Sequence, residues 1–227
     1  MKTIRIFISV MMATFVTSCA LDNYDMPSSS LSGRFIDNLT GESIQCDIYN
    51  GTTIQYIEDG YTQIQSNVVK ADGSYSIGQM FPGKYSIIPI YTNFEKVDTL
   101  KMDIEGKMTY DFVVEPYNRI TNVTILKSGL TKITATFTVE QANMDYGVMK
   151  VGMFLYKQPT AGAYMYFEAR ETIVGGQTIG TKTYTMTIDY KESTKLKSGE
   201  TYYVRVGALS SASNARYNYA PAVAVEI

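Results

Sequence analysis

The sequence predicts an all-β protein that consists of two consecutive antiparallel β-sandwich domains. Threonine, valine, isoleucine and tyrosine dominate the periodic segments, and these residue types favour strands. No segment keeps a helical period over ten residues, whereas short runs of alternating apolar and polar residues recur along the chain. Pro116 marks a boundary in this series, because proline cannot continue a central strand. We therefore expect one sandwich over residues 31–116 and a second over residues 117–227.

The first eighteen residues are typical of a secretion signal. Lys2 and Arg5 provide a positive start, and residues 6–16 form an apolar run far shorter than the ~20 residues of a spanning helix. The run ends in Val-Thr-Ser-Cys, which resembles the lipobox of bacterial lipoproteins, so we expect cleavage before Cys19 and acylation of its thiol. The alternative is an ordinary signal peptide that happens to contain a cysteine. Residues 19–30 lack periodicity and would form a lipidated, flexible tether.

The first sandwich is predicted from short alternating segments with turn signals between them. Asp72-Gly73 is the strongest of these signals, because this dipeptide favours the tight turn of a hairpin. Cys46 has the same parity as Ile44 and Ile48, so we expect a small buried strand residue rather than a reactive thiol. The expected strands are residues 31–37, 44–49, 53–58, 75–77, 84–90, 97–104 and 108–114.

The second sandwich is predicted from seven strands whose length and spacing suit an immunoglobulin-like or fibronectin-III-like fold. Residues 196–206 resemble the fibronectin-III segment in which leucine, glycine and tyrosine precede the penultimate strand. Tyr202 would then be the corner tyrosine, whose hydroxyl bonds back to the backbone; glycan stacking by Tyr202 is the alternative. Gly175-Gly176 is interpreted as a hairpin turn between two strands. The expected strands are residues 120–126, 132–139, 148–156, 164–169, 183–190, 201–209 and 222–227.

Several motifs together resemble a family of uncharacterised two-domain lipoproteins of Bacteroidota. They are found in residues 22–27, 31–45, 72–75 and 81–89, the last reading Phe-Pro-Gly-Lys-Tyr-Ser-Ile-Ile-Pro. In that family the N-terminal domain is similar to the carboxypeptidase regulatory, transthyretin-like sandwich, and the C-terminal domain is immunoglobulin-like. The resemblance implies a gene context beside an outer-membrane transporter and a glycan-binding lipoprotein of starch-utilisation-type uptake systems. It supplies no verified binding residue.

The absence of histidine is the most informative negative in the composition. It excludes a Ser-His-Asp or Cys-His catalytic set and His-based zinc sites. Candidate acids at polar strand ends or turns are interpreted as solvated charges, although a paired-carboxylate enzyme stays open as an alternative; they are Glu58, Asp59, Glu168 and Glu171. Without Lys2 and Arg5 the chain has 18 basic and 22 acidic residues and no basic stripe, so nucleic acid is not an expected partner. We expect no enzymatic activity, no cofactor and no metal.

Tyrosines outside the periodic cores are the candidates for ligand contact. Tyr156, Tyr164 and Tyr166 flank the loop of residues 157–162, and Tyr217 and Tyr219 flank the last loop. A sugar ring needs a flat apolar face with amides nearby, and loops of an immunoglobulin-like sandwich gather at its ends. One face of each strand must be core, so core or plain surface positions are the alternative for these side chains. The absence of tryptophan weakens the glycan interpretation.

These patterns lead to two functional hypotheses. The first is a non-catalytic lipoprotein of the outer membrane, held by lipid on Cys19 and facing the exterior, that binds a polysaccharide or oligosaccharide or assists its capture by a starch-utilisation-type uptake complex. The alternative is a structural or assembly lipoprotein that contacts envelope proteins and binds no glycan. Asp98-Thr99-Leu100 also matches a short pattern that is O-glycosylated in exported Bacteroidota proteins, which makes Thr99 a candidate modification site, unless the match is due to chance.

Overall fold

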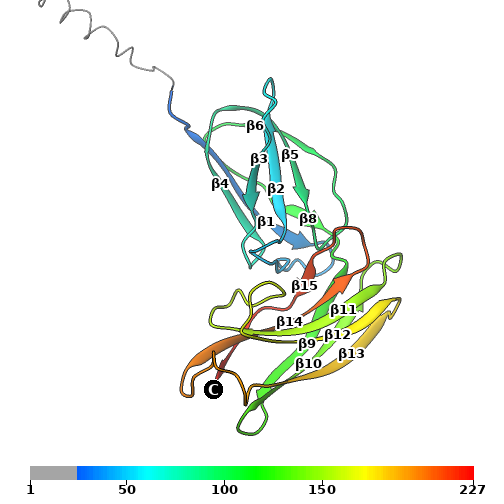
Figure 1. The fold of residues 1–227 in the computed structure, drawn as a ribbon. Coiled ribbons are helices and arrows are strands. Elements are labelled where there is room, and N and C mark those ends of the chain that lie inside the picture. The colour runs from blue at the N-terminus through cyan, green and yellow to red at the C-terminus, as the bar shows by residue number, and fades with distance from the viewer. Residues whose placement is uncertain (1–24) are drawn as a thin grey trace, which may run out of the picture.

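The structure, a computed structural model, describes residues 25–227 and contains two β-sandwiches stacked end to end (Figure 1). These residues contain strands, turns and irregular segments but no α-helix, so the all-β prediction is confirmed. It follows that no helix within residues 25–227 could cross a membrane. The predicted signal segment and Cys19 lie outside the described residues.

The first sandwich packs a sheet of strand order β4-β1-β7, in which β8 also pairs with β1, against a sheet of order β3-β2-β5-β6. Most of the pairs are antiparallel, but β1 runs parallel to both β7 and β8. The strand bounds are β1 Ser29–Asp37, β2 Thr53–Glu58, β3 Gln65–Val68, β4 Ser74–Met80, β5 Gly83–Ile90, β6 Leu100–Ile104, β7 Lys107–Thr109 and β8 Phe112–Val114.

Alternation along the strands places the core of this sandwich where the sequence pattern indicates. Leu31 and Phe35 of β1 are fully buried and meet Ile54 and Ile87 of the facing sheet in one hydrophobic cluster. The ring of Phe35 stacks on Phe94 at a centroid distance of 4.8 Å. Buried aromatic pairs of this kind add to the stabilisation that comes from removing apolar area from water.

The second sandwich packs a sheet of order β13-β10-β9 against a sheet of order β12-β11-β14-β15, in which β16 also pairs with β14. This division into three and four strand positions is the fibronectin-III-like arrangement that was predicted, since β15 and β16 together occupy the last position. The strand bounds are β9 Asn118–Lys127, β10 Lys132–Gln141, β11 Val148–Tyr156, β12 Glu168–Gln177, β13 Thr181–Asp189, β14 Thr201–Ser210, β15 Tyr217–Tyr219 and β16 Val223–Glu226.

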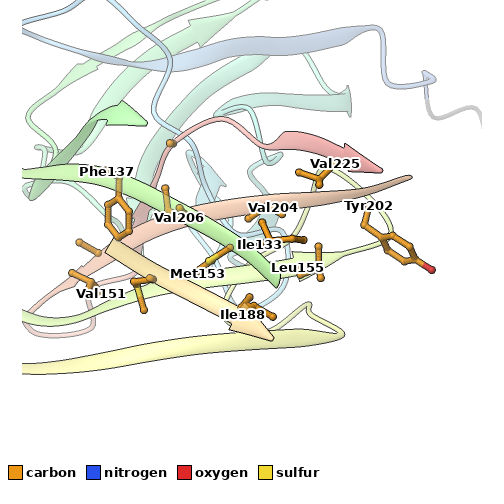
Figure 2. Packing of buried hydrophobic residues seen from close by; sticks show 14 of the residues in the cluster. Ile133, Phe137, Val151, Met153, Leu155, Ile188, Tyr202, Val204, Val206 and Val225 are labelled. Atoms are coloured by element: carbon orange, nitrogen blue, oxygen red, sulfur yellow. The ribbon is translucent and has the colours of Figure 1, made fainter. Parts of the chain in front are cut away.

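Side chains from both sheets fill the core of the second sandwich (Figure 2). Ile133 and Ile188 come from one sheet, and Met153 and Val206 come from the other. Tyr202 lies at the edge of this core, and its hydroxyl accepts a hydrogen bond from the backbone N–H of Lys197 at 3.0 Å. The corner role predicted for Tyr202 is therefore confirmed, whereas its buried ring is not available to stack on a sugar.

Four local expectations were wrong. Residues 44–49 form no strand, because Ser43 and Gln45 each make a single bridge to a different partner strand. Residues 164–167 are a loop that precedes β12. Gly175 and Gly176 lie within β12, where the register against β11 shifts between Val148 and Lys150, so they form a bulge rather than a hairpin turn. The Asp72-Gly73 turn joins β3 to β4, and these strands belong to different sheets.

Candidate functional site

The predicted tyrosines lie where the two sandwiches meet. The loop of residues 157–167, between β11 and β12, reaches the irregular segment 44–50 of the first sandwich. Reciprocal backbone hydrogen bonds between Gly162 and Met165 close a two-residue turn, which places Tyr164 at the tip. A Cβ atom at Gly162 would lie 2.1 Å from the Oδ1 atom of Asp47, so only glycine permits this close approach of the two domains.

Three tyrosines of this region are exposed and form what we call the junction patch: Tyr49, Tyr164 and Tyr166. Their exposed fractions are 66%, 49% and 47%, respectively. The rings of Tyr49 and Tyr164 lie edge to face with their centroids 6.2 Å apart, although one belongs to each domain. The ring of Tyr166 lies 6.3 Å from that of Phe154 on β11. The patch therefore offers aromatic surface to solvent across the domain boundary.

Tyr156 supports the patch rather than forming its surface. It is half-buried, and its ring packs against Phe167 at a centroid distance of 4.9 Å. Exposure alternates from Tyr164 to Phe167 as expected, even though this segment is not a strand. Tyr164 and Tyr166 are the exposed members, so their role in ligand contact stays a prediction.

The placement of Tyr217 and Tyr219 at a ligand surface was wrong. Both rings are buried on β15 in a small cluster with Phe154 and Ala161. Their rings stack on each other at 5.5 Å and make edge contacts with Phe154. Tyr219 lies against Asp47 of the first domain, and both rings are less than 7% exposed, so neither offers a free face to a sugar.

A buried polar cluster lies beneath this cover. The hydroxyl of Tyr219 donates to the carboxylate of Asp47, 2.9 Å from Oδ2, and accepts the N–H of Ala163 at 2.9 Å. The guanidinium of Arg205 lies 4.2 Å from the centre of the Tyr219 ring and donates to the carbonyls of Cys46 and Ala161. Tyr219 thus bridges a cation and an anion from different domains.

The electrostatics of this cluster follow from its burial. Burial raises the pKa of Asp47 to about 6, although the Tyr219 hydroxyl and the charges of Arg205 and Arg216 oppose the rise. Burial also raises the pKa of Tyr219 well above its usual value and lowers that of Arg205. Within residues 25–227, no carboxylate oxygen lies within 4.0 Å of an Arg205 nitrogen. The guanidinium is held by carbonyls and a ring face instead of a direct ion pair.

Two further contacts hold the domains together. Asp37 at the end of β1 receives two hydrogen bonds from Arg119 of β9, each of 2.7 Å. Burial acts to raise the pKa of Asp37, but the bonds from Arg119 and the backbone of Leu39 prevail and lower it. A cleft of about 330 Å³ opens beside this pair.

Asn93 donates to the carbonyls of Gln45 and Tyr217, which ties it to both domains. These buried bonds fix the orientation in which Tyr49 meets Tyr164.

Polar groups adjoin the patch on the sheet β12-β11-β14-β15. The Tyr217 hydroxyl donates to Glu171 of β12, and Lys150 of β11 forms a 3.1 Å ion pair with the same carboxylate. Burial, followed by the bond to Glu171, raises the pKa of Tyr217, so its hydroxyl stays protonated at neutral pH. A hydroxyl-rich ligand on the patch would find both donors and acceptors here.

The remaining candidate residues are dispersed. Glu58 lies at the end of β2 beside Tyr85, far along the chain from Glu168 and Glu171 on β12. No group of three histidine, cysteine, aspartate or glutamate side chains within residues 25–227 could hold a metal ion. Cys46 is buried as expected, and burial raises the pKa of its thiol to about 12. Thr99 is exposed just before β6.

Sequence reasoning missed Tyr49, which the expected strand 44–49 concealed. The available signal was parity, because Tyr49 alternates with Ile44, Cys46 and Ile48. This signal fails at Asp47, which has the parity of Tyr49 and is buried, since the segment forms no strand. Parity alone could not show that a loop from the other domain lies beside Tyr49.

Comparison with known proteins covers both domains. Residues 29–115 match the family model "Protein of unknown function (DUF3823) N-terminal domain", and residues 118–224 match "Domain of unknown function (DUF3823_C)". No curated protein matches the chain.

Three solved structures resemble the whole of the described fold. A candidate carbohydrate-binding protein from Bacteroides uniformis is 26% identical, covers 88% of this chain and 100% of its own, and superposes with a TM-score of 0.75. A DUF3823 family protein from Bacteroides ovatus is 25% identical over 87% of this chain and 98% of its own, with a TM-score of 0.70. Another from Parabacteroides merdae shares the fold at 21% identity, with coverages of 89% and 100% and a TM-score of 0.75.

Proposed function

The chain belongs to the DUF3823 family, and from that premise we propose that it is a non-catalytic surface lipoprotein that binds glycan. In this proposal it acts alone or assists an outer-membrane uptake complex in capturing glycan. The junction patch is the observation that carries the proposal, since it exposes three tyrosine rings at a domain boundary that buried hydrogen bonds hold together.

The chemistry of the patch suits a sugar ring. The C–H face of a pyranose is apolar, and packing it against an exposed tyrosine ring removes both surfaces from water. The hydroxyls at the edge of the sugar need hydrogen-bonding partners, which Glu171, Lys150 and the tyrosine hydroxyls can provide. The buried contacts of Asp47 and Arg119 hold the rings in place before a ligand arrives, so binding would order few side chains.

The comparison with the Bacteroides uniformis protein also supports the proposal of glycan binding. That protein is described as a candidate carbohydrate-binding protein, and its structure superposes on 88% of this chain with a TM-score of 0.75. The proposed membrane attachment is supported by the sequence around Cys19. Two or three acyl chains on one cysteine would anchor the protein stably, whereas a single chain would bind only reversibly.

The binding proposal is tested on residues 20–227, which lack the lipid-bearing cysteine. The protein is run in native gels that contain soluble polysaccharides of plant, host or microbial origin, and a binding polymer retards it. Tyr164→Ala should reduce the retardation, because it removes the exposed ring at the tip of the turn. Tyr164→Phe should keep it if stacking dominates. Leu130→Ala changes an exposed apolar side chain in the β9–β10 turn and serves as the control.

Either outcome is informative. Retardation that depends on Tyr164 supports the junction patch as the binding surface. Free migration of the unsubstituted protein in every gel would contradict glycan binding and favour the assembly role. Membrane attachment is tested separately in cells, where Cys19→Ala should move the protein from the membrane fraction to the soluble fraction.

A further inference from the structure

A second aromatic pocket lies at the end of the first sandwich that faces away from the second domain. It is formed around the loop between β2 and β3, drawn in cyan at the top of Figure 1. The pocket has a volume of about 250 Å³. It is lined by four aromatic residues, Tyr56, Tyr61, Phe81 and Tyr85, together with Ile57, Glu58, Gln63 and Gln65.

The base of the pocket follows from the strand register. Tyr56 of β2 pairs with Gln65 of β3, and Glu58 pairs with Tyr85 of β5. Paired residues project from the same face of a sheet, and residues two apart share that face, so these four side chains point the same way. Ile54 lies on the same face of β2 and is fully buried. The pocket is therefore the continuation of the core face beyond the covered part of the sandwich.

The base is also fixed in position. Tyr85 is buried, and its hydroxyl lies 3.0 Å from the carbonyl of Phe81 and 3.3 Å from Oε2 of Glu58. The turn that carries Tyr61 is closed by its N–H, which donates to the carbonyl of Glu58. Gly60 provides the positive φ of 90° within this turn. The walls are exposed, with 68% of Tyr61 and 43% of Phe81 accessible.

We propose that this pocket binds one uncharged sugar unit of a glycan. The identification of the ligand as a sugar rests on the proposed function, and the pocket would be a second contact point, separate from the junction patch. Its volume lies below the ~300–1,000 Å³ range of sites for drug-sized ligands, which suits a single ring. Aromatic walls cover the apolar face of such a ring, and the amides of Gln63 and Gln65 can both donate to and accept from its hydroxyls.

The carboxylate of Glu58 sets the charge preference. It lines the pocket beside the hydroxyl of Tyr85, and the lining includes no lysine or arginine. A carboxylate on the ligand would meet a like charge at short range, which is unfavourable. Glu58 can instead accept hydrogen bonds from sugar hydroxyls. The pocket should therefore select neutral sugar units over uronic acids.

The absence of tryptophan from the chain makes a specific reporter possible. In residues 20–227, Phe81→Trp keeps an aromatic wall and introduces the only indole, so its fluorescence reports on this pocket alone. Emission is followed as neutral polysaccharides (amylopectin, galactomannan, xyloglucan) or acidic polygalacturonate are added. Tyr61→Ala and Phe81→Ala are compared in affinity gels with Ile64→Ala, an exposed residue of the same loop that does not line the pocket.

The proposal predicts that one neutral polymer shifts the indole emission of Phe81→Trp and that polygalacturonate does not. Affinity for that polymer should fall about tenfold in Tyr61→Ala and Phe81→Ala but remain unchanged in Ile64→Ala. Retention that depends only on Tyr164, with constant indole emission, overturns the pocket and leaves the proposed function standing. If no polymer retards the protein or shifts the emission, both fail.

A lipid contact is the competing explanation, because Ser29 at the start of β1 pairs with Met80, next to Phe81, so residues 25–28 lead into the sandwich at this end. Tyr61→Ala and Phe81→Ala are therefore also tested for binding to phosphatidylethanolamine–phosphatidylglycerol vesicles. If these substitutions weaken vesicle binding and leave polymer retention intact, the sugar assignment is overturned.

Discussion

Replacing Asp47 with asparagine should change how the stability of the protein depends on pH. Asp47 is buried between the domains, and its described hydrogen bonds come from one group, the Tyr219 hydroxyl. Asparagine has nearly the same shape, keeps an oxygen that can accept this bond, and carries no charge. The substitution therefore isolates the cost of burying the charge.

The magnitude follows from the pKa of the folded protein. Burial raises the pKa of Asp47 from 3.8 to about 6, a change of about two units, and each unit corresponds to about 1.36 kcal/mol. The pKa of Asp47 is higher in the folded than in the unfolded protein, so ionising the buried carboxyl lowers the free energy of unfolding. This cost is absent below about pH 4, grows between pH 4 and 6, and is complete above pH 6. Asp47→Asn should thus exceed the unsubstituted protein in free energy of unfolding by about 3 kcal/mol at pH 7 and match it near pH 4.

Urea unfolding at several pH values between 4 and 7 measures this difference directly. Other titrating groups, such as Asp37 with its lowered pKa, are shared by both proteins and cancel in the comparison. A variant that is less stable at pH 7 would refute the reasoning. That result would mean that attraction between Asp47 and Arg205 outweighs the cost of burial.

Three further substitutions or treatments test the described packing. Arg119→Ala leaves the buried carboxylate of Asp37 unpaired and should cost about 3–5 kcal/mol in urea unfolding; a loss below about 1 kcal/mol would show that the pair contributes little. Gly33→Ala places a Cβ 1.8 Å from the carbonyl oxygen of Tyr110 and should lower stability by at least about 2 kcal/mol, measured by thermal unfolding, whereas an unchanged melting temperature contradicts this contact. Cys46 should resist a thiol reagent at pH 8 in the native protein and react once urea unfolds it; rapid native labelling would contradict its burial.

Local pattern was sufficient for most of the fold. Alternation predicted the strand over residues 31–37, and in the structure Leu31 and Phe35 of β1 face the core, because a strand places every second residue on one face. The residues around Tyr202 identified the corner of the second sandwich, since leucine, glycine and tyrosine have fixed roles in that turn. Both features depend on neighbours in sequence.

Partner choice could not be predicted in the same way. The parallel pairing of β1 with β7 and β8 depends on how a distant segment returns, and alternation is the same for parallel and antiparallel neighbours. The sequence could not distinguish a turn from a bulge at Gly175 and Gly176, because a positive φ at glycine suits both.

The domain junction accounts for the errors in the site. Tyr217 and Tyr219 occupy the outward face of β15, which a single sandwich would expose. Asp47 of the first domain contacts Tyr219, and the sequence of one domain carries no local sign of that contact. The same contact brings Tyr49 to Tyr164. The junction patch was therefore only partly predictable, through Tyr164 and Tyr166 at the exposed end of their loop.

A double-mutant cycle on Tyr49 and Tyr164 tests the central claim most directly, namely that rings from both domains form one glycan-binding surface. The affinity of residues 20–227 for the polysaccharide that retards them is measured for Tyr49→Ala, Tyr164→Ala and the double variant. We predict that each single substitution weakens binding and that the double variant loses less than the sum, because both rings contact the same ligand. Unchanged affinity in both single variants would contradict the claim.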